Sequence, residues 1–241
     1  MKFIIYLTKI VVAGIIALLF GACQFNGIKG SGNVTTENRT VNGEFSKIQA
    51  SKGLDIVLEQ SNAKAVIVEA DDNLQKHITT KVENGVLIIT SDYSGYINVK
   101  SKKIIVQAPK IDGIEVSSGA SFKTKNTLKM NSISVESSSG ADIQMAVETE
   151  KLSCEASSGS QISIHGKAIE FETASSSGSN IEAEDLLSND IIANASSGGT
   201  LDIHPIVSLN AEASSGGNIT YHAIPKTITK KSSSGGSINK E

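Results

Sequence analysis

The chain has 241 residues, of which 39% are hydrophobic and 4% aromatic, and its formal net charge is −3. This length suits one solenoid or one large domain. The 22 basic and 25 acidic side chains nearly balance, so no basic patch of the size that nucleic acid binding needs is expected, and that class of partner is excluded.

The first 23 residues have the layout of a bacterial export signal. Lys2 and Lys9 supply positive charge, residues 10–20 form an apolar run, and the small pair Gly21-Ala22 stands directly before Cys23. A small pair before cysteine resembles the lipobox, where the signal is cut off and the cysteine carries lipid. The alternative is an uncut transmembrane anchor, for which the run is short. The sequence therefore predicts a lipoprotein signal peptide over residues 1–22 and lipidation at Cys23.

The rest of the chain divides into a tether and a head domain. Residues 23–43 are rich in Gly, Asn and Thr and predict a flexible tether. Residues 44–241 predict one β-solenoid head, irregular over 44–113 and regular over 114–241. In the irregular part, Asn84-Gly85 is a hairpin turn signal, and residues 71–77 indicate one short helix or turn. Gly53 and Gly119 are 66 residues apart, which we interpret as about three coils and a loop.

A Ser-Ser-Gly motif occurs seven times in the second half of the chain, at intervals of 21, 19, 19, 20, 18 and 19 residues. Self-similarity at a fixed period of roughly 20 residues is the signature of a solenoid, in which each repeat forms one coil stacked on the last. We expect the repeat glycines to form the corners of these coils. They are Gly119, Gly140, Gly159, Gly178, Gly198, Gly216 and Gly235.

Apolar residues alternate with polar ones on both sides of every repeat glycine. This period of two predicts half-buried strands and not helices. Glycine at the corner takes positive φ without a Cβ clash, and the paired serines predict hydroxyl ladders along the turns. Cys154 falls at an inward position, which predicts a buried core thiol. One inward column, seven residues before each glycine, holds Ile133, Leu152, Phe171, Ile191, Leu209 and Ile228.

Several stretches carry a resemblance to a known family. They are residues 51–60 (SKGLDIVLEQ), 68–74 (VEADDNL) and 82–87 (VENGVL), together with the Ser-Ser-Gly-Ala coils. They resemble the putative autotransporter adhesin head GIN domain family over roughly residues 44–229. This resemblance implies an all-β fold, a right-handed parallel β-helix or β-solenoid with coils of about 19–20 residues. It also implies export in a Gram-negative cell, often as a lipoprotein, and carries no catalytic assignment.

An outward position four residues before the repeat glycine is acidic on three successive coils, at Glu115, Glu136 and Glu155. Equal positions on neighbouring coils stack about 4.8 Å apart, so these carboxylates repel each other unless water or a cation separates them. The stripe is interpreted either as a solvated surface that favours solubility or as a weak contact for a divalent cation or a glycan.

The position six residues after the repeat glycine carries His165, Glu184, His204 and His222 on four consecutive coils. Imidazoles with a carboxylate beside them are ligands of zinc or copper, so a metal site is one interpretation of this column. The other interpretation is a polar column at the second corner of the coil, without a cofactor. A metal site needs converging ligands, which stacking alone does not provide.

Three functions are compatible with these patterns. The first is a non-enzymatic cell-envelope lipoprotein that presents a rigid β-solenoid for adhesion or for protein or glycan interaction. It would be anchored in the outer membrane, facing the periplasm or the cell surface, and would self-associate through open solenoid ends. The alternatives are a carbohydrate-active enzyme of the β-helix type and a divalent-metal-binding envelope protein. No nucleophile with a partnered base is evident, which disfavours an enzyme.

Overall fold

The computed structural model describes residues 27–241, so the predicted signal peptide and Cys23 lie outside the described residues. The N-terminal part contains β1 (Gly27–Lys29), β2 (Val34–Arg39), β3 (Lys47–Ala50), β4 (Asp55–Gln60), β5 (Ala65–Asp71), α2 (Asp72–Gln75), β6 (Ile78–Glu83), β7 (Val86–Ser91), β8 (Gly95–Ile97) and β9 (Lys102–Ala108). The regular part contains β10 (Gly113–Val116), β11 (Ser121–Thr124), β12 (Leu128–Ser137), β13 (Asp142–Ala156), β14 (Gln161–Ser175), β15 (Asn180–Ala195), β16 (Thr200–Ala213), β17 (Asn218–Tyr221), β18 (Thr227–Ser232) and β19 (Ser237–Lys240).

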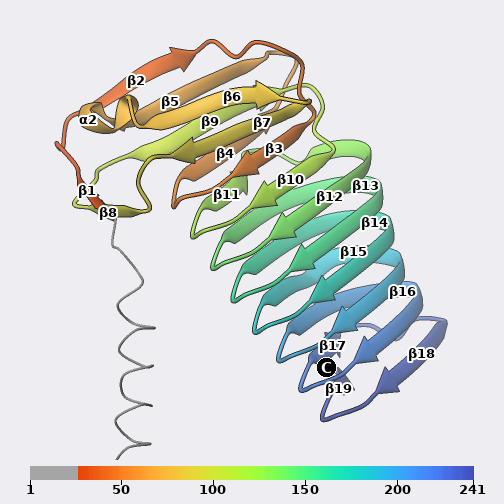
Figure 1. The fold of residues 1–241 in the computed structure, drawn as a ribbon. Coiled ribbons are helices and arrows are strands. Elements are labelled where there is room, and N and C mark those ends of the chain that lie inside the picture. Colours follow the sequence, from red (N-terminus) through yellow and green to blue (C-terminus); the bar gives the residue numbers. More distant parts are fainter. Residues whose placement is uncertain (1–26) are drawn as a thin grey trace, which may run out of the picture.

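The regular part is a stack of parallel coils, which confirms the predicted all-β solenoid (Figure 1). Each coil pairs in register with the next, for example β13 with β14 and β14 with β15. One side of the stack is formed by the segments before each Ser-Ser-Gly corner, and the other by the segments after it. We call these the A face and the B face.

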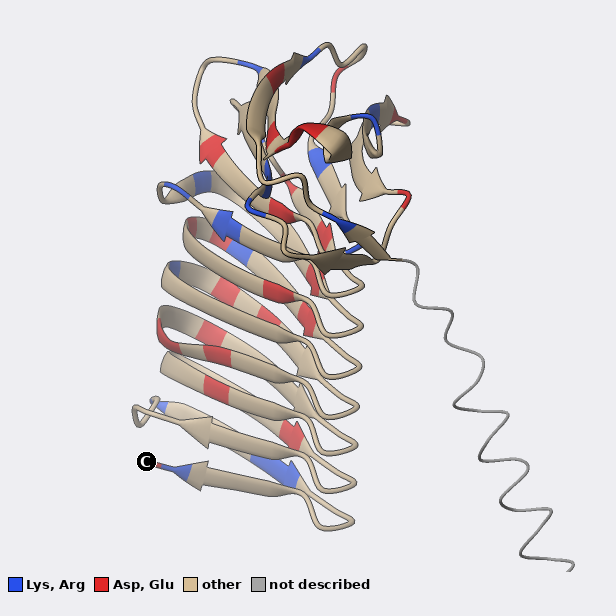
Figure 2. Cartoon of the chain, turned by 90° about the vertical axis from the view of Figure 1, so that its left-hand side faces the viewer, with Lys and Arg blue, Asp and Glu red and all other residues tan. Residues whose placement is uncertain are grey.

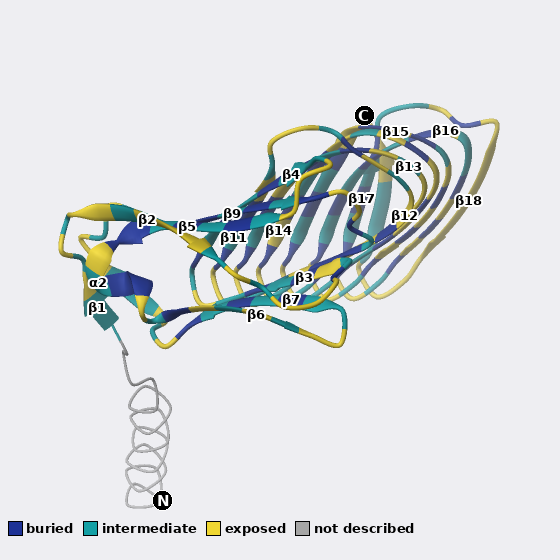
Figure 3. Ribbon diagram, turned by 90° about the horizontal axis from the view of Figure 1, so that it is seen from above, coloured by how far each residue is buried: buried dark blue, intermediate teal, exposed yellow. Residues whose placement is uncertain are grey.

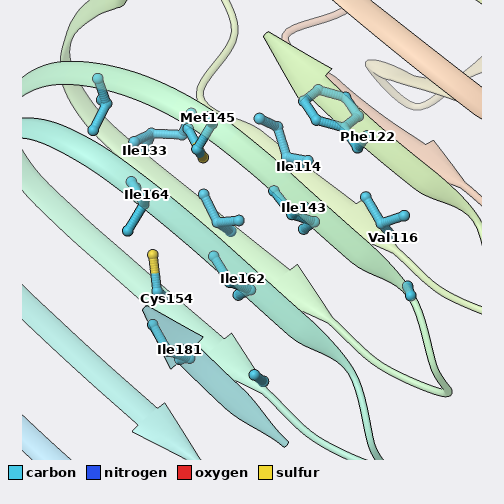
Figure 4. Close-up of a cluster of buried hydrophobic side chains, with 14 of the residues drawn as sticks. Ile114, Val116, Phe122, Ile133, Ile143, Met145, Cys154, Ile162, Ile164 and Ile181 are labelled. Carbon is cyan, nitrogen blue, oxygen red and sulfur yellow. The ribbon is translucent and has the colours of Figure 1, made fainter. Parts of the chain in front are cut away.

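Stacked apolar columns fill the interior of the coils. Ile133 pairs with Leu152, Leu152 with Phe171 and Phe171 with Ile191, as the repeat predicted. On the B-face side, Phe122, Ile143 and Ile162 follow each other in the same way. Cys154 is fully buried, and its sulfur points into the interior that holds Ile162 and Ile164 (Figure 4). The expected core thiol is therefore confirmed.

Each Ser-Ser-Gly corner is a type I′ turn. Ser118 has φ 52° and Gly119 has φ 69°, and Ala120 donates its backbone N–H to the Ser117 carbonyl at 3.2 Å. The sequence predicted positive φ for the glycine alone, but the second serine of every copy shares it. Neighbouring corners are joined through the backbone, since the Gly119 N–H donates to the Ser139 carbonyl at 3.1 Å. The expected hydroxyl ladder is thus a ladder of main-chain groups.

The order of the layers differs from the order of the sequence. β4 lies between β9 and β11, and β3 lies between β7 and β10. The coil of β3 and β4 therefore stacks directly on the coil of β10 and β11, although paired residues such as Gln49 and Glu115 are 66 positions apart. The expectation of about three coils between Gly53 and Gly119 is wrong. The chain between them forms a layer on the side of the β3 and β4 coil that faces away from β10 and β11.

The segment expected to be a flexible tether is partly ordered. β1 pairs with β8, and β2 pairs antiparallel with β5. The buried Asp71 carboxylate explains part of this order, because it accepts backbone N–H groups from Gly32 at 2.8 Å and from Lys100 and Ser101 at 3.0 Å. Asn73 adds a bond to the Lys29 carbonyl at 2.8 Å. The head thus begins at residue 27 in the described chain.

The two ends of the stack are built differently. At the N-terminal end, β6 runs antiparallel along β7, and β5 and β2 extend the sheet beyond β9 in the same antiparallel manner, beside the short helix α2. At the other end, β18 pairs with β16 and β19 with β17, and no strand among residues 27–241 lies beyond them. All six residues of β18 are exposed (Figure 3).

Candidate interaction surfaces

The acidic stripe lies on the A face in the predicted register. Glu115 pairs with Glu136, and Glu136 with Glu155, so the three carboxylates occupy successive coils. Gln49 extends the column on the other side, and its side-chain amide donates to Glu115 at 3.1 Å. Figure 2 shows acidic segments recurring on neighbouring coils. Within residues 27–241, neither Glu136 nor Glu155 has an ion-pair partner within 4.0 Å.

Some other acidic residues on the solenoid pair with lysines of the neighbouring coil. Lys129 lies 2.9 Å from Glu148, and Lys151 lies 2.9 Å from Glu170. The Lys129 hydrogen bond lowers the pKa of Glu148, and the Glu170 hydrogen bond raises the pKa of Lys151. No lysine among the described residues pairs in this way with Glu136 or Glu155.

A shallow groove runs beside the stripe across the coils. Its larger section has a volume of about 680 Å³ and is lined by Ser134, Ser153 and Glu172, with Ile192 at one end. A second section of about 390 Å³ shares Ser134 and continues past Gly113 to the β7 layer. The groove forms because the outward column that contains Gly113, Ser134 and Ser153 has small side chains and lies between two other outward columns. The sequence did not lead us to predict this groove. Equal spacing of Gly113, Ser134 and Ser153 from the corners was the available signal.

The four residues of the predicted metal column do not come together. The pairing between β15 and β16 shifts between Ala183 and Leu187, so the register partner of His204 is Leu187 and not Glu184. His204 Nδ1 lies 3.0 Å from the main-chain carbonyl of Glu184 and makes no contact with its carboxylate. Among residues 27–241, no three His, Cys, Asp or Glu side chains are placed to share a metal ion. The unequal coil lengths at this corner cause the slip.

His165 and His222 have separate surroundings. His165 is exposed and pairs with Ala146 on the preceding coil. His222 lies 3.9 Å from Asp202 and 3.4 Å from Glu241, each through a different ring nitrogen, so these carboxylates flank the ring. Burial raises the pKa of the Asp202 carboxyl. His222 thus lies at a polar corner between two carboxylates.

Two further observations concern the described residues. The two groove sections beside the stripe are shallow and open, and no histidine is among the residues that line them. Residues 27–241 also contain no helix that is long and apolar enough to cross a membrane.

Comparison with known proteins agrees with the fold. The crystal structure of a putative adhesin from Bacteroides fragilis has a TM-score of 0.79 at 24% identity, over 89% of this chain and 100% of that chain. A putative lipid binding protein from Parabacteroides distasonis has a TM-score of 0.70 at 23% identity, over 89% and 99% of the two chains. A putative adhesin from Parabacteroides merdae has a TM-score of 0.70 at 19% identity, over 90% of this chain and 99% of that chain.

The sequence itself identifies the family. No curated protein matches this chain. The model of one family, described as putative auto-transporter adhesin, head GIN domain, matches residues 44–225, which is most of the chain. The resemblance noted in the sequence is therefore confirmed. The chain belongs to the putative auto-transporter adhesin head GIN domain family.

Proposed function

We propose that this protein is a non-enzymatic interaction protein of the bacterial cell envelope. The observation that carries the proposal is a solenoid whose interior is filled by stacked side chains and whose outer faces are long and open, with a groove that crosses several coils. Such a surface suits contact with an extended glycan or another protein and offers no enclosed reaction site. The adhesin names of the family and of its structural neighbours support this role.

The contact surface that we propose is the A face, where the groove follows the acidic stripe. A glycan hydroxyl or a basic protein side chain finds uncompensated carboxylates there, at Glu136 and Glu155. Binding of the head to a glycan array or to an envelope extract tests this, with Glu136→Gln/Glu155→Gln as the variant and Glu172→Gln as a comparison within the groove. Binding without release of new reducing ends or unsaturated sugars supports the proposal, whereas product release supports the β-helix enzyme.

We further propose that the head is held at the outer membrane through lipid on Cys23. The motif before Cys23 supports this, and Gly27 enters the fold at the capped end of the stack, far from the last coil (Figure 1). Metabolic labelling with an alkyne fatty acid tests the anchor. We expect label in the wild-type chain and none in Cys23→Ala, and an unlabelled wild-type chain would contradict the anchor.

A further inference from the structure

A two-stranded sheet lies where the described chain enters the fold. β1 and β8 pair in parallel, apart from the large sheet of the stack (Figure 1). Their register partners Ile28 and Tyr96 are partly buried and pack against the core. The alternation of side chains along a strand therefore turns Lys29 and Ile97 outward, and Ile97 is 44% exposed. We call this outer side, which consists of Gly27, Lys29, Gly95 and Ile97, the entry face.

Three lysines on or beside the entry face have no acidic partner. Lys52 lies next to it, since the Lys52 carbonyl accepts the Tyr96 hydroxyl at 2.9 Å. The Lys100 side chain lies beside Gly32, just after β1. These two lysines and Lys29 are exposed, and none of them lies within 4.0 Å of a carboxylate oxygen in residues 27–241. The two lysines of β9, in contrast, are both paired with carboxylates.

The acidic side chains of this region already have other contacts. Asp71 is buried and accepts three backbone N–H groups. Asp72 accepts the side-chain amide of Asn33 at 2.9 Å. Asp92 lies 2.9 Å from His77 Nδ1. Each of these carboxylates thus has a partner of its own, and the lysines of the entry face remain open to an outside anion.

The predicted lipid on Cys23 would lie close to the entry face. Only residues 24–26 separate Cys23 from Gly27. A chain spans at most about 3.3–3.6 Å per residue, so the distance from Cys23 to Gly27 is no more than about 14 Å. The polar layer on each side of a bilayer is about 5–8 Å thick. A head anchored through Cys23 therefore has its entry face within reach of the headgroups, whereas the last coil lies at the far end of the stack (Figure 1).

We propose that the entry face docks on the phosphate-bearing headgroups of the membrane that holds the Cys23 lipid. This inference rests on the proposed lipid anchor. Lysines near an anionic membrane surface are attracted to it, and the exposed Ile97 beside them inserts at headgroup level. Contact by three lysines and one isoleucine is weak alone, but the anchor keeps it at high effective concentration. Docking gives the stack one orientation at the membrane, so the A face points in a constant direction.

A first experiment tests the contact without the anchor. The chain from residue 23 onward, carrying Cys23→Ser, is sedimented with vesicles of phosphatidylcholine alone or mixed with phosphatidylglycerol. We expect more binding to the anionic vesicles, and less as salt rises. Lys29→Glu/Lys100→Glu should lower the partition coefficient at least about tenfold, because each attraction becomes a repulsion. Lys167→Glu/Lys226→Glu is the matched control at exposed lysines of distant coils and should bind as the parent chain does.

A second experiment restores the anchor chemically. The Cys23 thiol is coupled to a maleimide lipid in the same two kinds of vesicle, while Cys154 is protected by its burial. We expect the amides of residues 27–31 and 95–100 to exchange hydrogen more slowly on the anionic vesicles than on phosphatidylcholine. Amides of β18, at the other end of the stack, should exchange equally on both.

The apolar part of the contact has its own matched pair of variants. Ile97→Ser should reduce the slowing of exchange on the coupled chain, whereas Ile192→Ser, at a 48% exposed site on the A face, should not. Weak sedimentation together with slowed exchange on the coupled chain supports the proposal, since the contact then needs the anchor. Equal exchange of the entry face on the two kinds of vesicle would overturn it, as would an equal loss of binding in the two lysine double variants. Neither experiment depends on lipidation in the cell, so failure of the natural anchor leaves both results unaffected.

Discussion

Gly53 donates its backbone N–H to the carbonyl of Ser118 at 3.0 Å, so the first Ser-Lys-Gly corner and the first Ser-Ser-Gly corner are direct neighbours in the stack. Lys52 and Gly53 share the positive φ of the later corners, at 62° and 67°. The first coil of the chain, formed by β3 and β4, therefore has a neighbour on each side. On one side lies a layer formed by the later strands β7 and β9, and on the other side lie the regular coils. The irregular part completes the solenoid instead of preceding it.

This layer order predicts which residues can be joined by a disulfide. Val57 and Lys123 are register partners on β4 and β11, so their Cα atoms lie about 4.8 Å apart, within the range that a disulfide spans. We expect Val57→Cys/Lys123→Cys to cross-link under mild oxidation, as seen by a mobility shift on non-reducing gels. Gln144 lies one layer further on, so Val57→Cys/Gln144→Cys is the control and should stay reduced. The opposite pattern would contradict the enclosed coil.

The type I′ corners predict unequal roles for the two serines of the motif. Ser177 has φ 54°, a region that costs a β-branched residue about 1–2 kcal/mol. We expect Ser177→Val to lower the free energy of unfolding by about that amount in urea titrations, and Ser177→Gly to be tolerated. Ser176→Val is the adjacent control, at a position without positive φ, and a larger loss there would contradict the assignment of the turn.

Asp71 predicts a specific weakness at the start of the head. Its replacement by alanine leaves three backbone N–H groups without their acceptor, each worth about 1–3 kcal/mol when buried. We expect Asp71→Ala to lose hydrogen-exchange protection at residues 30–33 and 98–101 and to reduce the melting temperature. Asp185→Ala, at an exposed carboxylate, should change neither. Unchanged exchange in Asp71→Ala would show that other bonds hold this segment.

Burial raises the pKa of the Cys154 thiol above its ordinary value of 9.0, since no charged form is solvated in the core. In the unfolded chain this thiol has its ordinary pKa. The contribution of the neutral, buried thiol to the free energy of unfolding is therefore complete below about pH 9 and declines as the pH rises further. We expect the difference in unfolding free energy between wild type and Cys154→Ala to shrink from pH 8 to pH 10. Native protein should also resist a thiol reagent until it is denatured, and rapid modification at pH 8 would contradict the burial.

The uncompensated stripe predicts an electrostatic signature. Glu136→Gln removes repulsion from two neighbouring carboxylates and should raise the unfolding free energy by about 0.2–1 kcal/mol at low salt. The gain should fade at high salt, where screening weakens the repulsion. Glu170→Gln breaks the pair with Lys151 and should be neutral or slightly destabilising. Equal effects of the two substitutions would show that the stripe carries no special repulsion.

The repeat made much of this fold predictable. In a parallel stack every residue contacts its counterpart one coil away, so the identity of the inward residues recurs and reveals the coil, as the column from Ile133 to Ile228 shows. The acidic stripe followed from the same regularity. The layer order was not predictable, because the pairing of Gln49 with Glu115 spans 66 residues and leaves no local pattern.

Other differences arise from single residues that break the period. A shift in pairing between Ala183 and Leu187 separates the histidines that share a sequence register. Positive φ at Ser118 and its equivalents is a property of the turn type, which serine does not reveal by itself. The order of residues 27–39 depends on contacts with distant residues, such as the bond from Gly32 to Asp71, more than 30 positions away, so composition alone indicated a tether.

The most direct test of an envelope interaction protein is protease treatment of intact cells that produce the wild-type chain or Cys23→Ala. We expect the wild-type head to sediment with outer membranes and to be shaved from cells if it faces outward, or only after the outer membrane is opened if it faces the periplasm. Cys23→Ala should leave the membrane fraction. A wild-type chain found in the cytoplasm, protected from protease even when the outer membrane is opened, would contradict the central claim.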